Sequence, residues 1–74
     1  MYFLVQIKHS PEGQWTKGVV VKETLDAARQ SFHAYLGAYG YGNDPQTDFV
    51  ECAILDMNGR VRDCVVDNRI AEEE

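Results

Sequence analysis

Hydrophobic and polar residues alternate along the first part of the chain, which is the period-two signal of a β-strand. The alternation covers residues 2–8, and residues 15–22 resume with β-branched and aromatic side chains. Between them, residues 9–14 are rich in turn formers, so we expect an antiparallel hairpin. In the first strand the two sides carry Phe3, Val5 and Ile7 on one, and Tyr2, Leu4, Gln6 and Lys8 on the other.

The period then changes to that of a helix. Thr24 is a suitable N-cap, and Asp26 places a negative charge in the first turn, where it favours the helix dipole. Apolar side chains recur at three- and four-residue spacing and predict one buried stripe on a helix of about four turns. The stripe consists of Leu25, Ala28, Phe32, Tyr35, Leu36 and Tyr39. We expect Gly40 to end the helix in a left-handed conformation, followed by an irregular loop to about residue 47.

A second hairpin is predicted from strands at 48–56 and 60–66, joined by Asp56-Met57-Asn58-Gly59. Two turns fit this string: a two-residue loop at Asn58-Gly59, or a four-residue type I turn closed by a glycine bulge. The registers differ by one residue. The bulged register places Cys52 opposite Cys64, whereas the two-residue loop points them to opposite faces.

The order β-β-α-β-β predicts an α+β fold, with a four-stranded, mainly antiparallel sheet and one helix packed on one face. At 74 residues the chain is long enough for one small core only. We expect a single domain over residues 1–66 and a polar, acidic tail over residues 67–74.

A sheet with one helix has a second, uncovered face, and apolar residues gathered on such a face usually mark an interface. If Phe3, Val5 and Ile7 lie under the helix, the uncovered face carries Tyr2, Leu4, Val20, Phe49 and Leu55, with Cys64 and Val66 or with Val61 and Val65 according to the hairpin register. Tyr41, in a glycine-flanked loop, belongs either to an interface or to the end of the core. Trp15 has the same two interpretations, with core burial favoured. The candidate interface residues are therefore Tyr2, Leu4, Val20, Phe49, Leu55 and Tyr41.

The formal net charge of −5 is unevenly distributed. Residues 1–66 have six Lys or Arg and eight Asp or Glu, a balance of −2, and residues 67–74 have one Arg and four acids, a balance of −3. The basic residues are scattered, so the sequence provides no basic face for phosphates, and we expect no direct nucleic-acid binding.

The amino terminus lacks the charged region and cleavage site of a signal peptide, and its apolar run is too short to span a membrane. We expect a cytoplasmic protein without membrane association. Both cysteines are then reduced thiols, because the cytosol keeps such pairs reduced.

Short strings that resemble reactive or ligand-binding motifs have simpler explanations. Asp56-Met57-Asn58-Gly59 resembles the start of a calcium loop, but the flanking segments are strands and not helices. Gly37, Gly40 and Gly42 lie at the end of a helix, whereas phosphate loops precede one and use its amino terminus. His9 and His33 are expected to be solvated, the cysteines to pack mid-strand, and the acids to be dispersed surface charges. We expect no metal, no cofactor and no catalytic residue.

These features favour a non-enzymatic protein-interaction module that pairs with a second copy through the uncovered sheet face or its edge strands, or else with another protein. A second hypothesis is an acidic inhibitor or decoy, of the kind that phages and mobile elements encode, that blocks a nucleic-acid-binding protein. A small enzyme is the third and least supported class.

Overall fold

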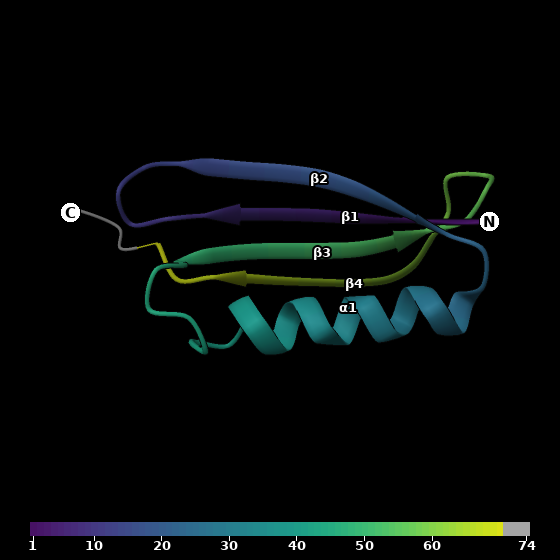
Figure 1. Cartoon of the computed structure of the whole chain (residues 1–74). Coiled ribbons are helices and arrows are strands. Elements are labelled where there is room, and N and C mark those ends of the chain that lie inside the picture. The colour runs from purple at the N-terminus through teal and green to yellow at the C-terminus, as the bar shows by residue number, and fades with distance from the viewer. Residues whose placement is uncertain (71–74) are drawn as a thin grey trace.

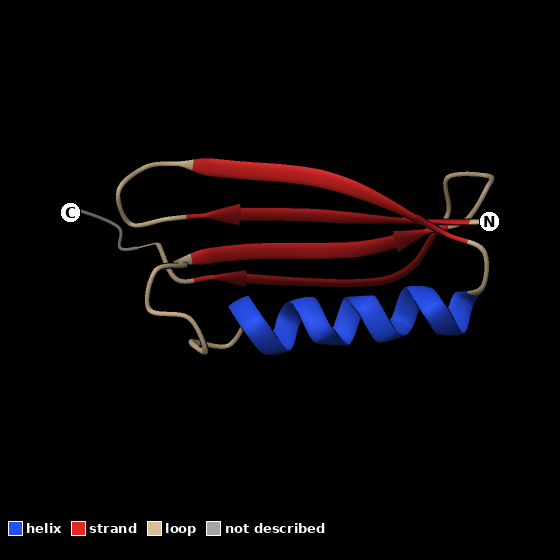
Figure 2. Ribbon diagram, viewed as in Figure 1, coloured by secondary structure: helices blue, strands red, loops and turns tan. Residues whose placement is uncertain are grey.

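The computed structural model describes residues 1–70 and contains four strands and one helix in the expected order. The elements are β1 (Tyr2–His9), β2 (Trp15–Lys22), α1 (Leu25–Tyr39), β3 (Phe49–Leu55) and β4 (Val61–Asn68). All neighbouring strands are antiparallel, in the order β2-β1-β3-β4, so β1 and β3 are central. The helix lies along one side of this sheet (Figures 1 and 2). The predicted α+β architecture is confirmed.

The last strand extends beyond the expected end of the domain. β4 continues to Asn68, and the Arg69 amide donates to the Asp48 carbonyl at 2.6 Å. The first residues of the expected tail therefore belong to the sheet. The remainder of that tail, residues 71–74, lies outside the described residues.

The two ends of α1 are determined by different local interactions. At the start, the Thr24 hydroxyl accepts from the Ala27 amide at 3.1 Å, which confirms the predicted N-cap. At the other end the expectation for Gly40 is wrong, because its φ of −86° is not left-handed. A glycine is needed there for space, since a Cβ would come within 2.8 Å of the Leu36 carbonyl oxygen. The positive φ angles follow at Tyr41 and Gly42.

The core lies between the helix and one face of the sheet. The helix contributes the predicted stripe, with Phe32 and Leu36 almost completely buried. Each such side chain contributes about 1.5–3 kcal/mol to folding through removal of apolar surface from water. The buried cluster consists of Leu4, Ala28, Phe32, Leu36, Val50, Cys52 and Ile54. Its margin is formed by Tyr2, Val20, Leu25, Tyr35, Tyr39 and Val65.

The helix covers the opposite face of β1 from the one expected. Leu4 is completely buried, and Tyr2 and Val20 pack against the core beside it. Their placement on the uncovered face was wrong. Because side chains alternate along a strand, Phe3, Val5 and Ile7 must then point to the uncovered side.

The β3–β4 hairpin combines features of both expected turns. The Gly59 amide donates to the Asp56 carbonyl at 3.0 Å, and Gly59 has a φ of 78°, as in the four-residue turn with a glycine bulge. One step further, Leu55 faces Val61 but Ile54 faces Asp63, so a second bulge leaves Arg62 unpaired.

This second bulge shifts the register by one residue. Cys52 faces Val65 and Ala53 faces Cys64, which is the register that a two-residue loop gives. The two cysteines therefore point to opposite faces and cannot form a disulfide with each other.

Candidate interaction surface

The sheet has a face that no described element covers, and we call it the open face. Strand pairing places four residues of each strand on it, in four rows that run across the sheet. In the order β2-β1-β3-β4, the rows are Val21, Phe3, Leu55 and Val61; Val19, Val5, Ala53 and Cys64; Lys17, Ile7, Glu51 and Val66; Trp15, His9, Phe49 and Asn68.

The open face carries most of the exposed hydrophobic side chains of the described residues. Eight large hydrophobic residues are strongly exposed, and five of them lie on this face: Trp15, Val19, Val21, Val61 and Val66. Val19 and Val61 are about 60% exposed, at 61% and 60%. These exposed residues lie on the two edge strands, and the apolar residues of β1 and β3 connect them across the sheet, so the open face is a candidate interaction surface.

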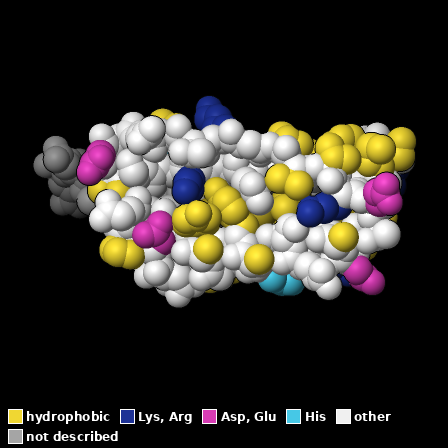
Figure 3. Space-filling model, viewed as in Figure 1, with side chains coloured by type: hydrophobic (Ala, Val, Ile, Leu, Met, Phe, Trp, Pro, Cys, Tyr) yellow, Lys and Arg dark blue, Asp and Glu magenta, His cyan; other side chains and the backbone are white. Residues whose placement is uncertain are grey.

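Apolar character is concentrated at one end of this face. The first two rows contain eight side chains without a single charge, and we call them the apolar half. They lie at the end of the sheet that carries the N terminus and the β3–β4 turn. In Figure 3, hydrophobic side chains are gathered at the end of the molecule where the N terminus lies in Figure 1. The other two rows, the polar half, include Lys17 and Glu51 on either side of Ile7.

An aromatic cluster of His9, Trp15 and Phe49 forms the outer row of the polar half. The ring centroids of His9 and Trp15 are 4.5 Å apart, and those of Trp15 and Phe49 are 5.4 Å apart in an edge-on arrangement. His9 Nδ1 donates to Asp48 Oδ1 at 2.6 Å, because a carboxylate can only accept. Only 13% of the His9 side chain is exposed, so the expectation that it is solvated was wrong. The reason is Asp48, which the chain brings back beside the end of β1.

The structure separates the residues predicted as interface candidates. Phe49 and Leu55 lie on the open face, as expected. Trp15, expected mainly in the core, is half-exposed there. Tyr41 is 57% exposed but lies on the helix side, where its amide donates to Asp67 Oδ2 at 2.7 Å. Tyr41 is therefore remote from the open face.

The sequence prediction missed the centre of the surface, which is made by Phe3, Val5 and Ile7 of β1. Both sides of β1 are apolar, so alternation alone did not show which side faces the helix. Lys8 is on the same side as Leu4, and a charged residue on that side favours solvent over the core. Its ammonium lies 3.8 Å from the centre of the Tyr39 ring, and this contact accommodates a lysine beside the helix.

Reactive side chains do not converge in the described part of the chain. Burial, with a smaller contribution from Cys64, raises the pKa of the Cys52 thiol to about 11, so this group is protonated and inert at neutral pH. Cys64 is exposed on the open face, and His33 is exposed and contacts the Phe32 ring. Within residues 1–70 no three His, Cys, Asp or Glu side chains are arranged to hold a metal ion. Over the same residues, the helix is not long and apolar enough to cross a membrane.

Comparisons of the chain with protein-family models, with curated proteins and with solved structures give no match.

Proposed function

We propose that this protein is a non-enzymatic interaction module that forms a homodimer through the open face. The observation that supports this most strongly is the apolar half, a continuous uncharged surface on the side of the sheet that α1 does not cover. In the dimer the two sheets stack face to face, with a helix on the outside of each.

The size of the open face is consistent with such an interface. Strands spaced about 4.8 Å apart, with a rise of about 3.3 Å per residue, give four strands of this length a flat area of about 500 Å². Two stacked copies bury about twice that, close to the roughly 1,000 Å² that a specific interface needs. The expected dimer is therefore one of moderate affinity, in equilibrium with its monomer.

A second copy is a suitable partner because a two-fold interface places the same patch on both sides. A patch without charges cannot oppose like charges when it meets itself, and the apolar half satisfies this condition. Lys17 and Glu51 lie in the third row, between the apolar half and the aromatic cluster, and their opposite charges allow them to pair when two copies meet. A small domain also gains stability from association, since its own core is limited.

Pairing through edge strands is the other route to a dimer, and the structure favours it less. The bulge at Arg62 interrupts the regular edge of β4. The edge of β2 is regular, but pairing there leaves the open face in water. A stacked dimer removes both the valines and the aromatic cluster from solvent.

Sedimentation equilibrium under reducing conditions, over a concentration series in the micromolar range, tests the proposal. We expect a reversible monomer–dimer equilibrium, with amide and side-chain NMR signals of β1 and β3 shifting as dimer forms. A strictly monomeric chain over that range would refute it. Shifts confined to the outer edge of β2 would indicate edge pairing instead.

No observation favours the acidic decoy as a second candidate. A decoy needs unpaired acids on one surface, whereas two acids of β4 are paired with arginines. Asp63 lies 3.6 Å from Arg29, and Asp67 accepts from Arg69 at 2.9 Å. The hydrogen bond from Arg69 and that from the Tyr41 amide hold the pKa of Asp67 below its usual value.

A further inference from the structure

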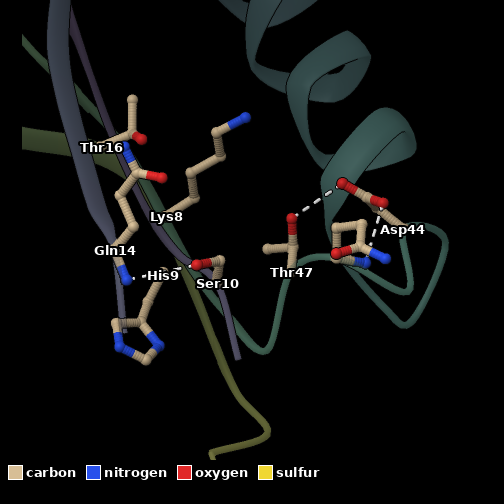
Figure 4. Close-up of a pocket in the computed structure, with 8 residues that line it drawn as sticks. Lys8, His9, Ser10, Gln14, Thr16, Asp44 and Thr47 are labelled. Carbon is tan, nitrogen blue, oxygen red and sulfur yellow. Dashed lines mark hydrogen bonds between the residues drawn. The ribbon is translucent and has the colours of Figure 1, made fainter. Parts of the chain in front are cut away.

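A small polar pocket lies on the helix side of the molecule, away from the apolar half. Its walls come from the β1–β2 hairpin on one side and from the loop between α1 and β3 on the other (Figure 4). The cavity has a volume of about 150 Å³. It is lined by Lys8, His9, Ser10, Gln14, Thr16, Asp44, Gln46 and Thr47.

Lys8 supplies a positive charge to one wall of this pocket. It projects from β1 on the helix-facing side, and its ammonium is held 3.8 Å from the centre of the Tyr39 ring. Within residues 1–70 the ion pairs join other residues, and Lys8 takes part in none of them. Lys8 is half-buried, and the Tyr39 ring satisfies only one direction of its ammonium, so the group can still bind an anionic ligand.

Asp44 supplies a negative charge to the facing wall. Its carboxylate is held in place by the Gln46 amide at 3.0 Å and by the Thr47 hydroxyl at 2.9 Å. These two hydrogen bonds, with a smaller effect of Lys8, hold the pKa of Asp44 below its usual value, so the group is ionised at neutral pH. Each carboxylate oxygen can still accept a further hydrogen bond from a ligand.

The two charges face the same cavity but do not pair with each other. Figure 4 shows Lys8 and Asp44 on opposite sides of the open space, with Thr47 beside Asp44. Neither side chain is in an ion pair with the other, although Lys8 is near enough to influence the ionisation of Asp44. A ligand that satisfies both walls must carry one positive and one negative group a short distance apart.

We propose that this pocket binds a small zwitterion of the α-amino acid class. Its carboxylate pairs with the Lys8 ammonium, and its own ammonium pairs with the Asp44 carboxylate. Both contacts are charge-assisted hydrogen bonds, and their opposite orientation determines which way the ligand lies. The site shares only His9 with the open face, and its two charged residues lie on the helix side, so binding does not depend on dimerisation.

The volume of the pocket limits the size of the ligand. A cavity of about 150 Å³ accommodates a molecule of the size of benzene, which has about six non-hydrogen atoms. Glycine and alanine are of this size, and a larger amino acid must leave its side chain outside. The remaining lining is polar and suits such a ligand. The Ser10 hydroxyl oxygen accepts from the Gln14 amide at 3.2 Å, which leaves its hydrogen free to donate.

A simple anion fits this site less well than a zwitterion. Phosphate or acetate gains the Lys8 contact but is repelled by the ionised Asp44 on the facing wall. A simple amine has the opposite difficulty. The pocket therefore discriminates by requiring both charges on one molecule.

NMR titration of the full chain with glycine, with L-alanine, and separately with acetate, methylamine and inorganic phosphate tests the assignment. We expect saturable shifts at Ser10, Gln14 and Thr47 with the two amino acids, and binding at least tenfold weaker for each single-charge probe. Acetate or phosphate binding as tightly as glycine would overturn the zwitterion assignment. Absence of saturable shifts with glycine and alanine would overturn the site.

Matched variants separate the two charges from general effects on the fold. Lys8→Gln and Asp44→Asn should each weaken glycine binding at least tenfold. Lys22→Gln and Asp26→Asn make the same charge changes away from the pocket and should leave binding unchanged. Because Asp44 also orders its loop, the NMR spectrum of Asp44→Asn must first show that this variant is folded. If Asp44→Asn is unfolded, the result for Lys8→Gln alone decides the question. Unchanged affinity in folded Lys8→Gln refutes the proposal.

Discussion

Replacing Val19 with lysine gives the sharpest test of the open-face dimer. Val19 lies in the second row of the apolar half and is 61% exposed in the isolated chain. Complete burial of a valine side chain contributes about 1.5–3 kcal/mol, so covering the exposed part contributes about 1–2 kcal/mol per chain. Because each dimer contains the substitution twice, the free energy of dimerisation becomes less favourable by about 2–4 kcal/mol. The dissociation constant should therefore rise by about 30- to 1,000-fold.

The same substitution should have little effect on the monomer, because an exposed position away from the core usually changes stability by less than about 0.5 kcal/mol. Ala34→Lys is the matched control, since Ala34 is exposed on the helix and the change in net charge is identical. Sedimentation equilibrium gives the dissociation constant, and urea unfolding of dilute protein gives the stability of each variant. A Val19→Lys protein that is folded and dimerises as tightly as Ala34→Lys would refute the assignment of the open face.

Three further predictions concern the fold itself. Gly37→Ala should raise the free energy of unfolding by about 1 kcal/mol, because a Cβ there meets open space on a helix. Gly40→Ala should lower the free energy of unfolding by about 1–3 kcal/mol, because its Cβ would come within 2.8 Å of the Leu36 carbonyl oxygen. Equal effects of the two substitutions in urea unfolding would contradict this explanation. In dilute, monomeric protein Cys64 should react at once with a thiol reagent at neutral pH and Cys52 only on unfolding, and the reacted thiols can be counted by absorbance. Folding raises the pKa of Cys52 from 9.0 to about 11, so the thiol of the unfolded chain ionises first and the free energy of unfolding should fall as the pH rises from 9 to 11. Cys52→Ala should lack that part of the decline. Identical dependence of stability on pH in the two proteins would contradict this prediction.

Local patterns in the sequence were sufficient for the secondary structure. The period-two and helical stripes, the Thr24 cap and the Asp56–Gly59 turn each depend on neighbours in sequence, and each is found in the structure. Such signals are local because they arise from backbone conformation and hydrogen bonds over a few residues. They gave the element order and the existence of an uncovered face, and they placed Phe49 and Leu55 on it.

The hairpin register shows where local information ended. The turn at Asp56–Gly59 is the four-residue turn with a glycine bulge, as its sequence allows. The second bulge at Arg62 shifts the pairing by one residue, so Cys52 and Cys64 point to opposite faces instead of facing each other. Nothing in the residues around Arg62 requires a bulge, and only the pairing of whole strands against the core determines it.

The identity of the open face, and the pocket on the helix side, were decided only by the tertiary structure. β1 is apolar on both sides, so the helix could select either, and packing of Leu4 with Ile54 and Phe32 decided the choice. The pocket likewise brings together Lys8 and Asp44, which are far apart in sequence. The sequence thus determined which elements form, because propensity is local. Only the folded chain determined which faces meet, because packing depends on residues distant in sequence.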